Sequence, residues 1–124
     1  MDLRGDNMKM YNNDLNLEFT RGDTFTFGII LYELGQNLDG AKFTCKQNVD
    51  DETPVFQKTL GSGVTLEKVD MDDYTYKIRV APEDTENLEA GKYFYDFQIE
   101  VGQDVFTILK GVLTLEADVS ERGQ

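Results

Sequence analysis

Apolar and polar residues alternate along most of this chain with the two-residue period of β-strands that bury one face. The pattern is most regular in segment 92–101, where Tyr93, Tyr95 and Phe97 share one face and Asp96 lies on the other. Clusters of glycine, asparagine and aspartate separate the alternating segments, which is typical of turns. Strands are therefore predicted over segments 15–19, 24–32, 41–47, 55–60, 64–69, 74–80, 92–101 and 105–119.

Segment 82–90 departs from this alternation. Pro82 suits the first position of a helix, Glu83 and Asp84 would lie near the positive end of the helix dipole, and Gly91 follows the segment. One short helix is therefore predicted near residues 82–90. The regular spacing of the strands predicts an all-β fold, an antiparallel β-sandwich or barrel of about seven to nine strands. The inward side chains are expected to include Phe27, Ile29, Phe43, Cys45, Tyr76, Ile78, Tyr95, Phe97 and Ile99.

Two strands carry apolar residues on both faces. Ile30 and Tyr32 lie opposite the inward set of their strand, which predicts cover on both faces over its second half. Segment 105–109 has no charged residue, and Gly111 after it marks a bulge or a bend. Outward apolar side chains need a cover, from the N-terminal arm or from another subunit. Assembly through sheet edges or through this C-terminal strand is therefore predicted.

A chain of 124 residues has room for one domain. The expected division is a flexible N-terminal arm at 1–13, a β-sandwich domain at 14–119 and a C-terminal tail at 120–124. The arm offers few apolar groups, so its deletion is expected to leave the melting temperature nearly unchanged. No apolar run is long enough to span a bilayer, and no signal peptide is expected at the N-terminus.

The charge and the missing residue types narrow the possible chemistry. There are 24 acidic and 12 basic residues, a formal net charge of −12, which argues against binding to nucleic acid or to an anionic membrane. Histidine is absent, and the single cysteine, Cys45, excludes an internal disulfide framework. The usual activated nucleophiles are therefore missing, and the chain is not expected to be an enzyme or to hold a cofactor.

Several segments resemble parts of short phage and prophage structural domains. They are Phe-Thr-Arg-Gly-Asp-Thr at 19–24, Val-Ala-Pro-Glu-Asp-Thr-Glu-Asn-Leu at 80–88, Ala-Gly-Lys-Tyr-Phe-Tyr-Asp at 90–96 and Gly-Val-Leu-Thr-Leu at 111–115, with Asp-Val at 118–119. Their order and spacing resemble the N-terminal domain of phage baseplate upper proteins and similar immunoglobulin-like phage tail proteins.

This resemblance implies an immunoglobulin-like antiparallel β-sandwich that serves as a virion building block. The implied partners are other virion proteins or further copies of the chain. The implied location is the virion, with the bacterial cytoplasm before assembly. The resemblance brings no catalytic residue. The alternative interpretation is a β-sandwich module that binds a carbohydrate or cell-surface ligand through loops at one end.

The motifs that could form functional sites also have simpler structural explanations. Arg-Gly-Asp occurs at 4–6 and at 21–23, and both are better explained as glycine turns than as integrin ligands. Asp70, Asp72 and Asp73, with acidic residues of segment 50–52, could offer oxygens to calcium, but solvated turns are the favoured explanation, because loop carboxylates alone do not fix a coordination shell. No pair of carboxylates is singled out for glycoside hydrolysis.

The aromatic residues and Cys45 have similar explanations. Tyr93, Tyr95 and Phe97 belong to the core face, whereas Phe94 is expected to be partly exposed, so a sugar-binding platform is the less favoured interpretation. Cys45 is expected to be a buried small apolar residue. No catalytic, cofactor-binding or metal-ligating residue is therefore assigned.

Overall fold

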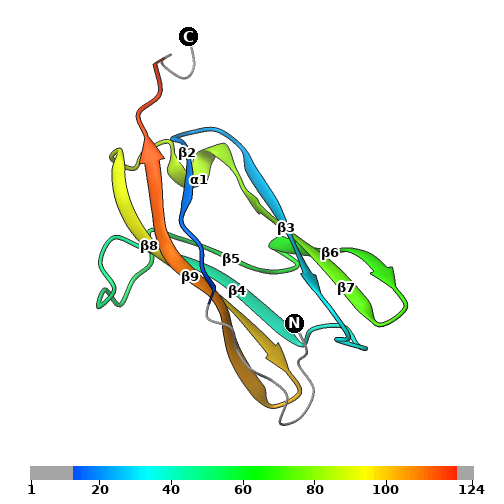
Figure 1. Cartoon of the computed structure of the whole chain (residues 1–124). Coiled ribbons are helices and arrows are strands. Elements are labelled where there is room, and N and C mark those ends of the chain that lie inside the picture. The colour runs from blue at the N-terminus through cyan, green and yellow to red at the C-terminus, as the bar shows by residue number, and fades with distance from the viewer. Residues whose placement is uncertain (1–12, 120–124) are drawn as a thin grey trace.

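A computed structural model describes residues 13–119 of the chain. These residues form nine strands and one short helix, so the predicted all-β class, the number of strands and the position of the helix are confirmed (Figure 1). The elements are β1 (Asn13–Asp14), β2 (Leu17–Thr20), β3 (Phe25–Leu31), β4 (Gly40–Lys46), β5 (Phe56–Leu60), β6 (Gly63–Asp70), β7 (Asp73–Val80), α1 (Pro82–Thr85), β8 (Gly91–Val101) and β9 (Asp104–Glu116).

The strands form one continuous sheet in the order β1-β9-β8-β4-β5-β6-β7-β3, and β2 also pairs with β9. Antiparallel pairing was predicted throughout, but the sheet is mixed. Strands β1 and β2 both run parallel to β9, and β5 runs parallel to the start of β6. The hydrophobic alternation could not show this, because it records which face of a strand is buried and not which strand lies beside it.

The sheet folds over on itself at the corner between β5 and β6. Gly61 and Gly63 have φ values of 88° and 102°, a region that glycine adopts without the strain of a side chain. At Gly63 a Cβ atom would lie 2.6 Å from Cδ of Lys58. This corner places β6, β7 and β3 opposite β9, β8 and β4, so the predicted two-layered arrangement is one nearly closed sheet (Figure 1).

The core lies between the two layers and contains the side chains predicted to point inward. Phe27 and Ile29 are the exceptions, because they are only half-buried. Strand β3 ends the sheet, so its inner face has a neighbour on one side only. The predicted cover on the other face of β3 is wrong, since Ile30 and Tyr32 are exposed.

The helix α1 is shorter than the predicted segment and ends at Thr85. Pro82 occupies its first turn, and Oδ2 of Asp84 accepts a hydrogen bond from the backbone N–H of Ala81 at 2.7 Å. The same carboxylate forms an ion pair with Nζ of Lys58 at 2.6 Å. These contacts fix the connection from β7 to β8.

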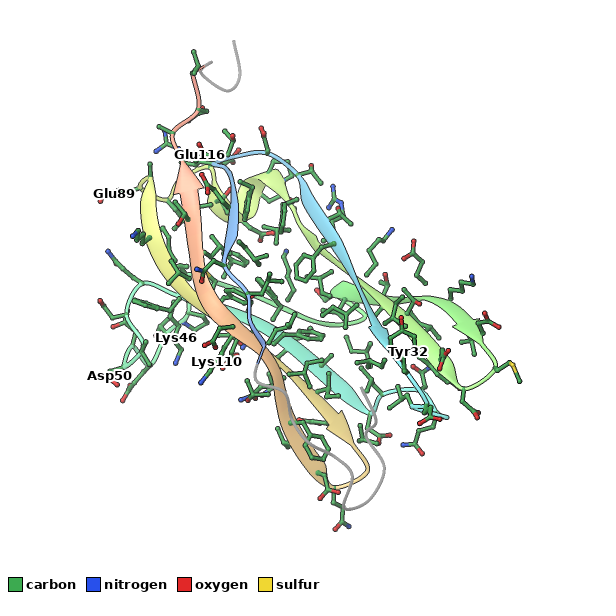
Figure 2. All side chains as sticks on the ribbon, in the orientation of Figure 1. Tyr32, Lys46, Asp50, Glu89, Lys110 and Glu116 are labelled. Carbon is green, nitrogen blue, oxygen red and sulfur yellow. The ribbon has the colours of Figure 1, made fainter. Side chains whose placement is uncertain are left out.

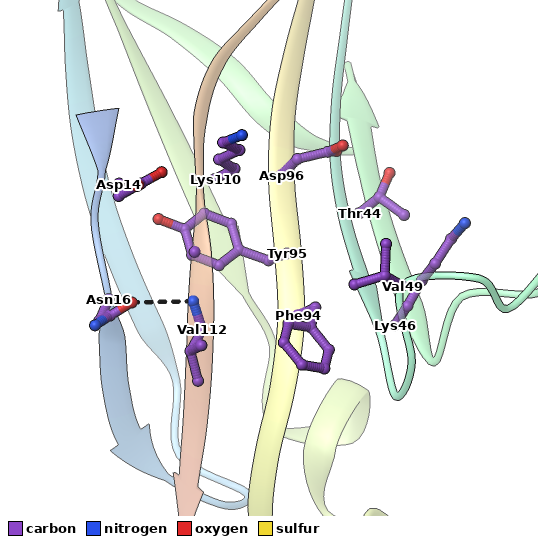
Figure 3. A pocket seen from close by; sticks show the side chains of 11 residues that line it. Asp14, Asn16, Thr44, Lys46, Val49, Phe94, Tyr95, Asp96, Lys110 and Val112 are labelled. Carbon is purple, nitrogen blue, oxygen red and sulfur yellow. Dashed lines mark hydrogen bonds between the residues drawn. The ribbon is translucent and has the colours of Figure 1, made fainter. Parts of the chain in front are cut away.

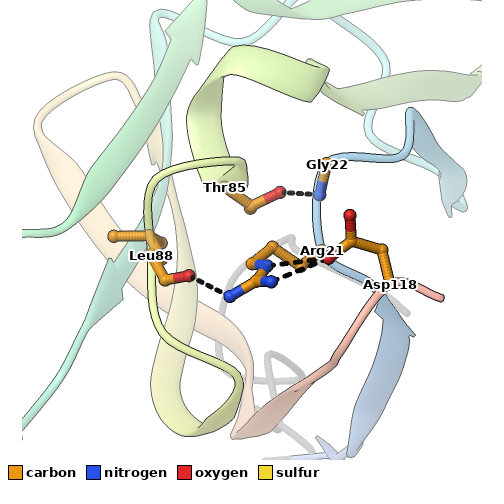
Figure 4. A network of polar contacts seen from close by, with 5 residues as sticks. All are labelled: Arg21, Gly22, Thr85, Leu88 and Asp118. Atoms are coloured by element: carbon orange, nitrogen blue, oxygen red, sulfur yellow. Dashed lines mark hydrogen bonds and ion pairs between the residues drawn. The ribbon is translucent and has the colours of Figure 1, made fainter. Parts of the chain in front are cut away.

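Arg21 joins three remote parts of the chain (Figure 4). Its guanidinium donates to Oδ1 of Asp118 at 2.8 and 3.1 Å and to the carbonyl of Leu88 at 3.1 Å. The next residue, Gly22, has a φ of 81° and donates its N–H to Oγ1 of Thr85 at 2.8 Å. The Arg-Gly-Asp triplet at 21–23 is thus a turn whose arginine is bound within the chain. The triplet at 4–6 lies outside the described residues.

Substitution of Thr85 with valine is expected to lower the free energy of unfolding by about 1–3 kcal/mol, because it leaves the buried N–H of Gly22 without an acceptor. Thr85 is fully buried, so water cannot readily replace the hydroxyl. The measurement is urea unfolding followed by circular dichroism. Thr85→Ser retains the hydroxyl and is the matched control. Equal stability of the valine variant and the wild type would contradict the importance of this bond.

The two terminal segments predicted from the sequence fall almost entirely outside the described residues. Only Asn13 of the predicted arm at 1–13 is described, and it pairs with Leu109 of β9. The tail at 120–124 lies beyond the last described residue. Within residues 13–119, the single short helix is neither long nor apolar enough to cross a membrane.

Candidate functional site

A groove of about 530 Å³ lies on the outer face of the sheet, over β1, β9, β8 and β4 (Figure 3). The strand register brings its side chains together in two rows. In the first, the polar row, Thr44 lies opposite Asp96, Asp96 opposite Lys110, and Lys110 opposite Asp14. Adjacent strands lie about 4.8 Å apart, so this row of four residues spans about 14 Å.

The second row, the Phe94 row, consists of Lys46, Phe94 and Val112. Phe94 points away from the core with 39% of its surface exposed, as its place in the alternation predicted. Val49, in the loop after β4, borders the same groove. An exposed aromatic ring between an aliphatic side chain and the stem of a lysine is therefore available to a ligand.

Taken together, the two rows contain two carboxylates and two ammonium groups. Asp14 and Asp96 balance Lys46 and Lys110, so the groove is formally neutral on a chain whose net charge is −12. Burial raises the pKa of the Asp96 carboxyl, and the nearby Lys46 and Lys42 offset part of that shift. No hydrogen bond or ion pair within residues 13–119 occupies the Asp96 carboxylate.

Gly111 and Tyr95 form the wall of the groove beside β1. Gly111 has no side chain, so the backbone of Leu15 lies directly against it, with the carbonyl carbon 3.0 Å from where a Cβ would be. The Tyr95 side chain extends to the same place, and its hydroxyl donates to the carbonyl of Leu15. Oδ1 of Asn16 accepts the N–H of Val112 at 3.1 Å (Figure 3). The interior glycine thus marks the place where the β1–β2 connection packs against β9.

The free edge of β3 is a second candidate surface. Among the described residues β3 pairs only with β7, which leaves one side of its backbone without a ladder. Its sequence, Phe-Thr-Phe-Gly-Ile-Ile-Leu, has no charge and no proline, and its pairing with β7 contains no bulge. Natural proteins usually protect edge strands with one of these features.

The C-terminal strand β9, one of the two places where assembly was predicted, is not a free edge over most of its length. Over Leu109–Glu116 this strand lies between β8 and the short strands β1 and β2, so its backbone is paired on both sides. Ile108, Leu113 and Leu115 are buried, whereas Val105 is exposed. Alternation alone did not distinguish this strand from β3, because both are apolar and nearly uncharged.

Carboxylates in the acidic turns accept hydrogen bonds from backbone N–H groups. Oδ1 of Asp73 accepts the N–H of Glu33 at 2.9 Å, and Oδ2 of Asp51 accepts the N–H of Asn48 at 3.0 Å. The loop that contains Asp50 and the β6–β7 turn lie on opposite sides of the molecule (Figures 1 and 2). Within residues 13–119, no three acidic, cysteine or histidine side chains come together as metal ligands would.

Cys45 is fully buried on the core face of β4, as predicted. Burial raises the pKa of its thiol to about 12. The thiolate is the reactive form of cysteine, so this thiol is unreactive near neutral pH while the protein is folded. The core positions of Tyr93, Tyr95 and Phe97 are likewise confirmed, which leaves Phe94 as the accessible aromatic residue of that strand.

No protein-family model matches its sequence, and no curated protein matches it.

Proposed function

We propose that this chain is a structural protein that works by assembly, and that copies of it join through the free edge of β3. The proposed setting is a phage or prophage virion, and it rests on the sequence resemblance to baseplate and tail proteins. The observation that supports the proposal is the uncharged, unbulged edge of β3. An edge of this kind is a template for strand addition.

The contrast with the other strands at the margins of the sheet supports this choice. Beyond its start, β6 carries Glu67 and Lys68, and its pairing with β7 is interrupted by a bulge between Leu66 and Lys68. On the opposite margin, β1 contains the charged residue Asp14 and β2 contains the charged residue Glu18. These features oppose strand addition, whereas β3 has neither charge nor bulge over its seven residues.

The chemistry near β3 also suits a second copy of the chain. Two β3 strands can pair without placing like charges opposite each other, because neither carries a charge. Lys77 and Arg79 of β7 lie opposite Gly28 and Thr26, so two basic residues beside this edge offset part of the acidic charge of the protein there. The half-buried side chains of Phe25, Phe27 and Ile29 would gain cover from an added strand.

The net charge of −12 on each copy opposes this association at long range. Salt screens that repulsion, with a Debye length of about 10 Å at 0.1 M and about 3 Å at 1 M. The fraction of dimer is therefore expected to rise with salt concentration. The measurement is sedimentation equilibrium of the full chain over a concentration series at low and at high salt.

Ile30→Lys tests the edge itself, because Ile30 is 46% exposed and the change places a charge on β3 without opening the core. The association constant is expected to fall by about tenfold or more. Val69→Lys is the matched control, since Val69 is 48% exposed on the already charged strand β6. A strict monomer at every salt concentration, or equal loss in both variants, would contradict assembly through β3.

The virion role is tested separately from the edge. Genes for capsid or tail proteins beside the gene for this chain, and the chain in purified particles by mass spectrometry, are the expected findings. An isolated gene whose product never copurifies with particles would contradict the phage role and leave the dimer measurement to stand on its own.

A further inference from the structure

The groove on the outer face of β4, β8 and β9 has features that assembly through β3 does not use. It lies on the other layer of the sheet, and its volume of about 530 Å³ falls within the usual range for small-molecule sites. Its lining residues come from four strands and two connecting segments, and most of them stand on paired strands, so the groove is largely preformed. Such positions hold a ligand more accurately than loop ends do.

The charges in the groove select the class of ligand. A strong anion would meet Asp14 and Asp96, and a strong cation would meet Lys46 and Lys110. A neutral molecule with many hydroxyl groups avoids both repulsions, because each hydroxyl can donate to a carboxylate and accept from an ammonium group. Hydrogen bonds to charged groups are also stronger than those between neutral groups.

Phe94 adds a flat apolar surface beside these polar groups. The C–H bonds on one face of a pyranose ring are slightly positive, and they pack well against the negative face of an aromatic ring. In the strand register Phe94 lies one row from Asp96, with Val112 and Lys46 as its cross-strand neighbours. A ring stacked on Phe94 would therefore have its edge hydroxyls near the polar row (Figure 3).

We propose that this groove binds a neutral saccharide, with a pyranose ring stacked on Phe94 and its hydroxyls hydrogen-bonded to Asp96 and to the flanking lysines. The site is independent of the β3 edge, since it uses the opposite layer of the sheet. It also differs from the sequence-based alternative, in which loops at one end of the sandwich would bind the ligand. Here the flat outer face of the strands does so.

The test is a titration of the ¹⁵N-labelled full chain, followed by NMR, with maltotriose, cellotriose, chitotriose and mannotriose. At least one of these probes is expected to shift the amide signals of residues 94, 96, 110 and 112 together, with a dissociation constant in the millimolar range or below. Failure of all four to shift these amides would overturn the proposal.

Two substitutions remove the proposed contacts separately. Phe94→Ala removes the stacking surface, and Asp96→Asn keeps the shape but removes the charge of the acceptor. Each is expected to weaken binding by about tenfold or more. Tyr32→Ala is the matched control, because Tyr32 is an exposed aromatic residue at the other side of the molecule from Lys46 and Lys110 (Figure 2).

Two further measurements exclude unfolding and altered assembly as causes of lost saccharide binding. Dispersed amide spectra of all variants establish that each is folded, so lost binding can be assigned to the groove. Ile30→Lys is expected to bind the saccharide as the wild type does, which separates this site from assembly. Equal affinity of Phe94→Ala and the wild type, or an equal loss in Tyr32→Ala, would overturn the placement of the ligand on Phe94.

Discussion

Phe43→Ala is expected to lower the free energy of unfolding by about 3–5 kcal/mol, a large part of the total stability of a domain of this size. Phe43 has no exposed surface and stands at the centre of the core. Its ring lies 5.2 Å from that of Tyr95, 5.7 Å from that of Phe27 and 6.1 Å from that of Phe56. Phe43 and these three neighbours belong to four different strands. The cavity that the substitution leaves therefore cannot close by movement of a single strand.

The measurement is urea unfolding of the wild type and the variant, with the midpoint and the slope compared. Phe94→Ala is the control, because it makes the same chemical change on the outer face of the sheet, where the side chain is exposed. We expect it to alter the free energy of unfolding by only about 0.5 kcal/mol. A loss below about 1 kcal/mol in Phe43→Ala would show that the core is not packed around this ring.

Gly111→Ala is expected to lower the free energy of unfolding by about 1–3 kcal/mol, because the new methyl group would overlap the backbone of Leu15. The carbonyl carbon of Leu15 lies 3.0 Å, and Oδ1 of Asn16 3.1 Å, from the place that a Cβ would occupy. Backbone atoms cannot turn away as a side chain can. The connection between β1 and β2 must move, and the bond from the Tyr95 hydroxyl to Leu15 would be disturbed.

Urea unfolding gives the size of this effect, and hydrogen exchange of the amides of β2 gives its location. Gly28→Ala is the control, since Gly28 is also a strand glycine, and its Cβ would meet only the carbonyl oxygen of Tyr76 at an ordinary 3.7 Å. Its stability is expected to match the wild type within about 0.5 kcal/mol. Equal effects of the two substitutions would contradict a specific contact at Gly111.

The alternation along the chain determined which faces of the strands are buried. Phe43, Cys45 and Tyr95 were predicted to point inward, and Phe94 to lie on the other face, because successive side chains of a strand point to opposite sides. Pro82 likewise marked the start of the helix, since proline fits the first turn and no later position. These are local properties of the backbone, and the sequence contains them directly.

The tertiary structure alone decided which strands lie side by side. The parallel pairing of β1 and β2 with β9 joins segments about a hundred positions apart, and no periodicity records such a partnership. Strand β3 pairs only with β7 among the described residues, so it lies at the margin with Ile30 exposed, which the alternation could not show. The pairing of β9 with both β1 and β8 also aligns Asp14, Asp96 and Lys110 in one row of the groove. A site assembled across strands depends on register, and register is set by the packing of the whole sheet.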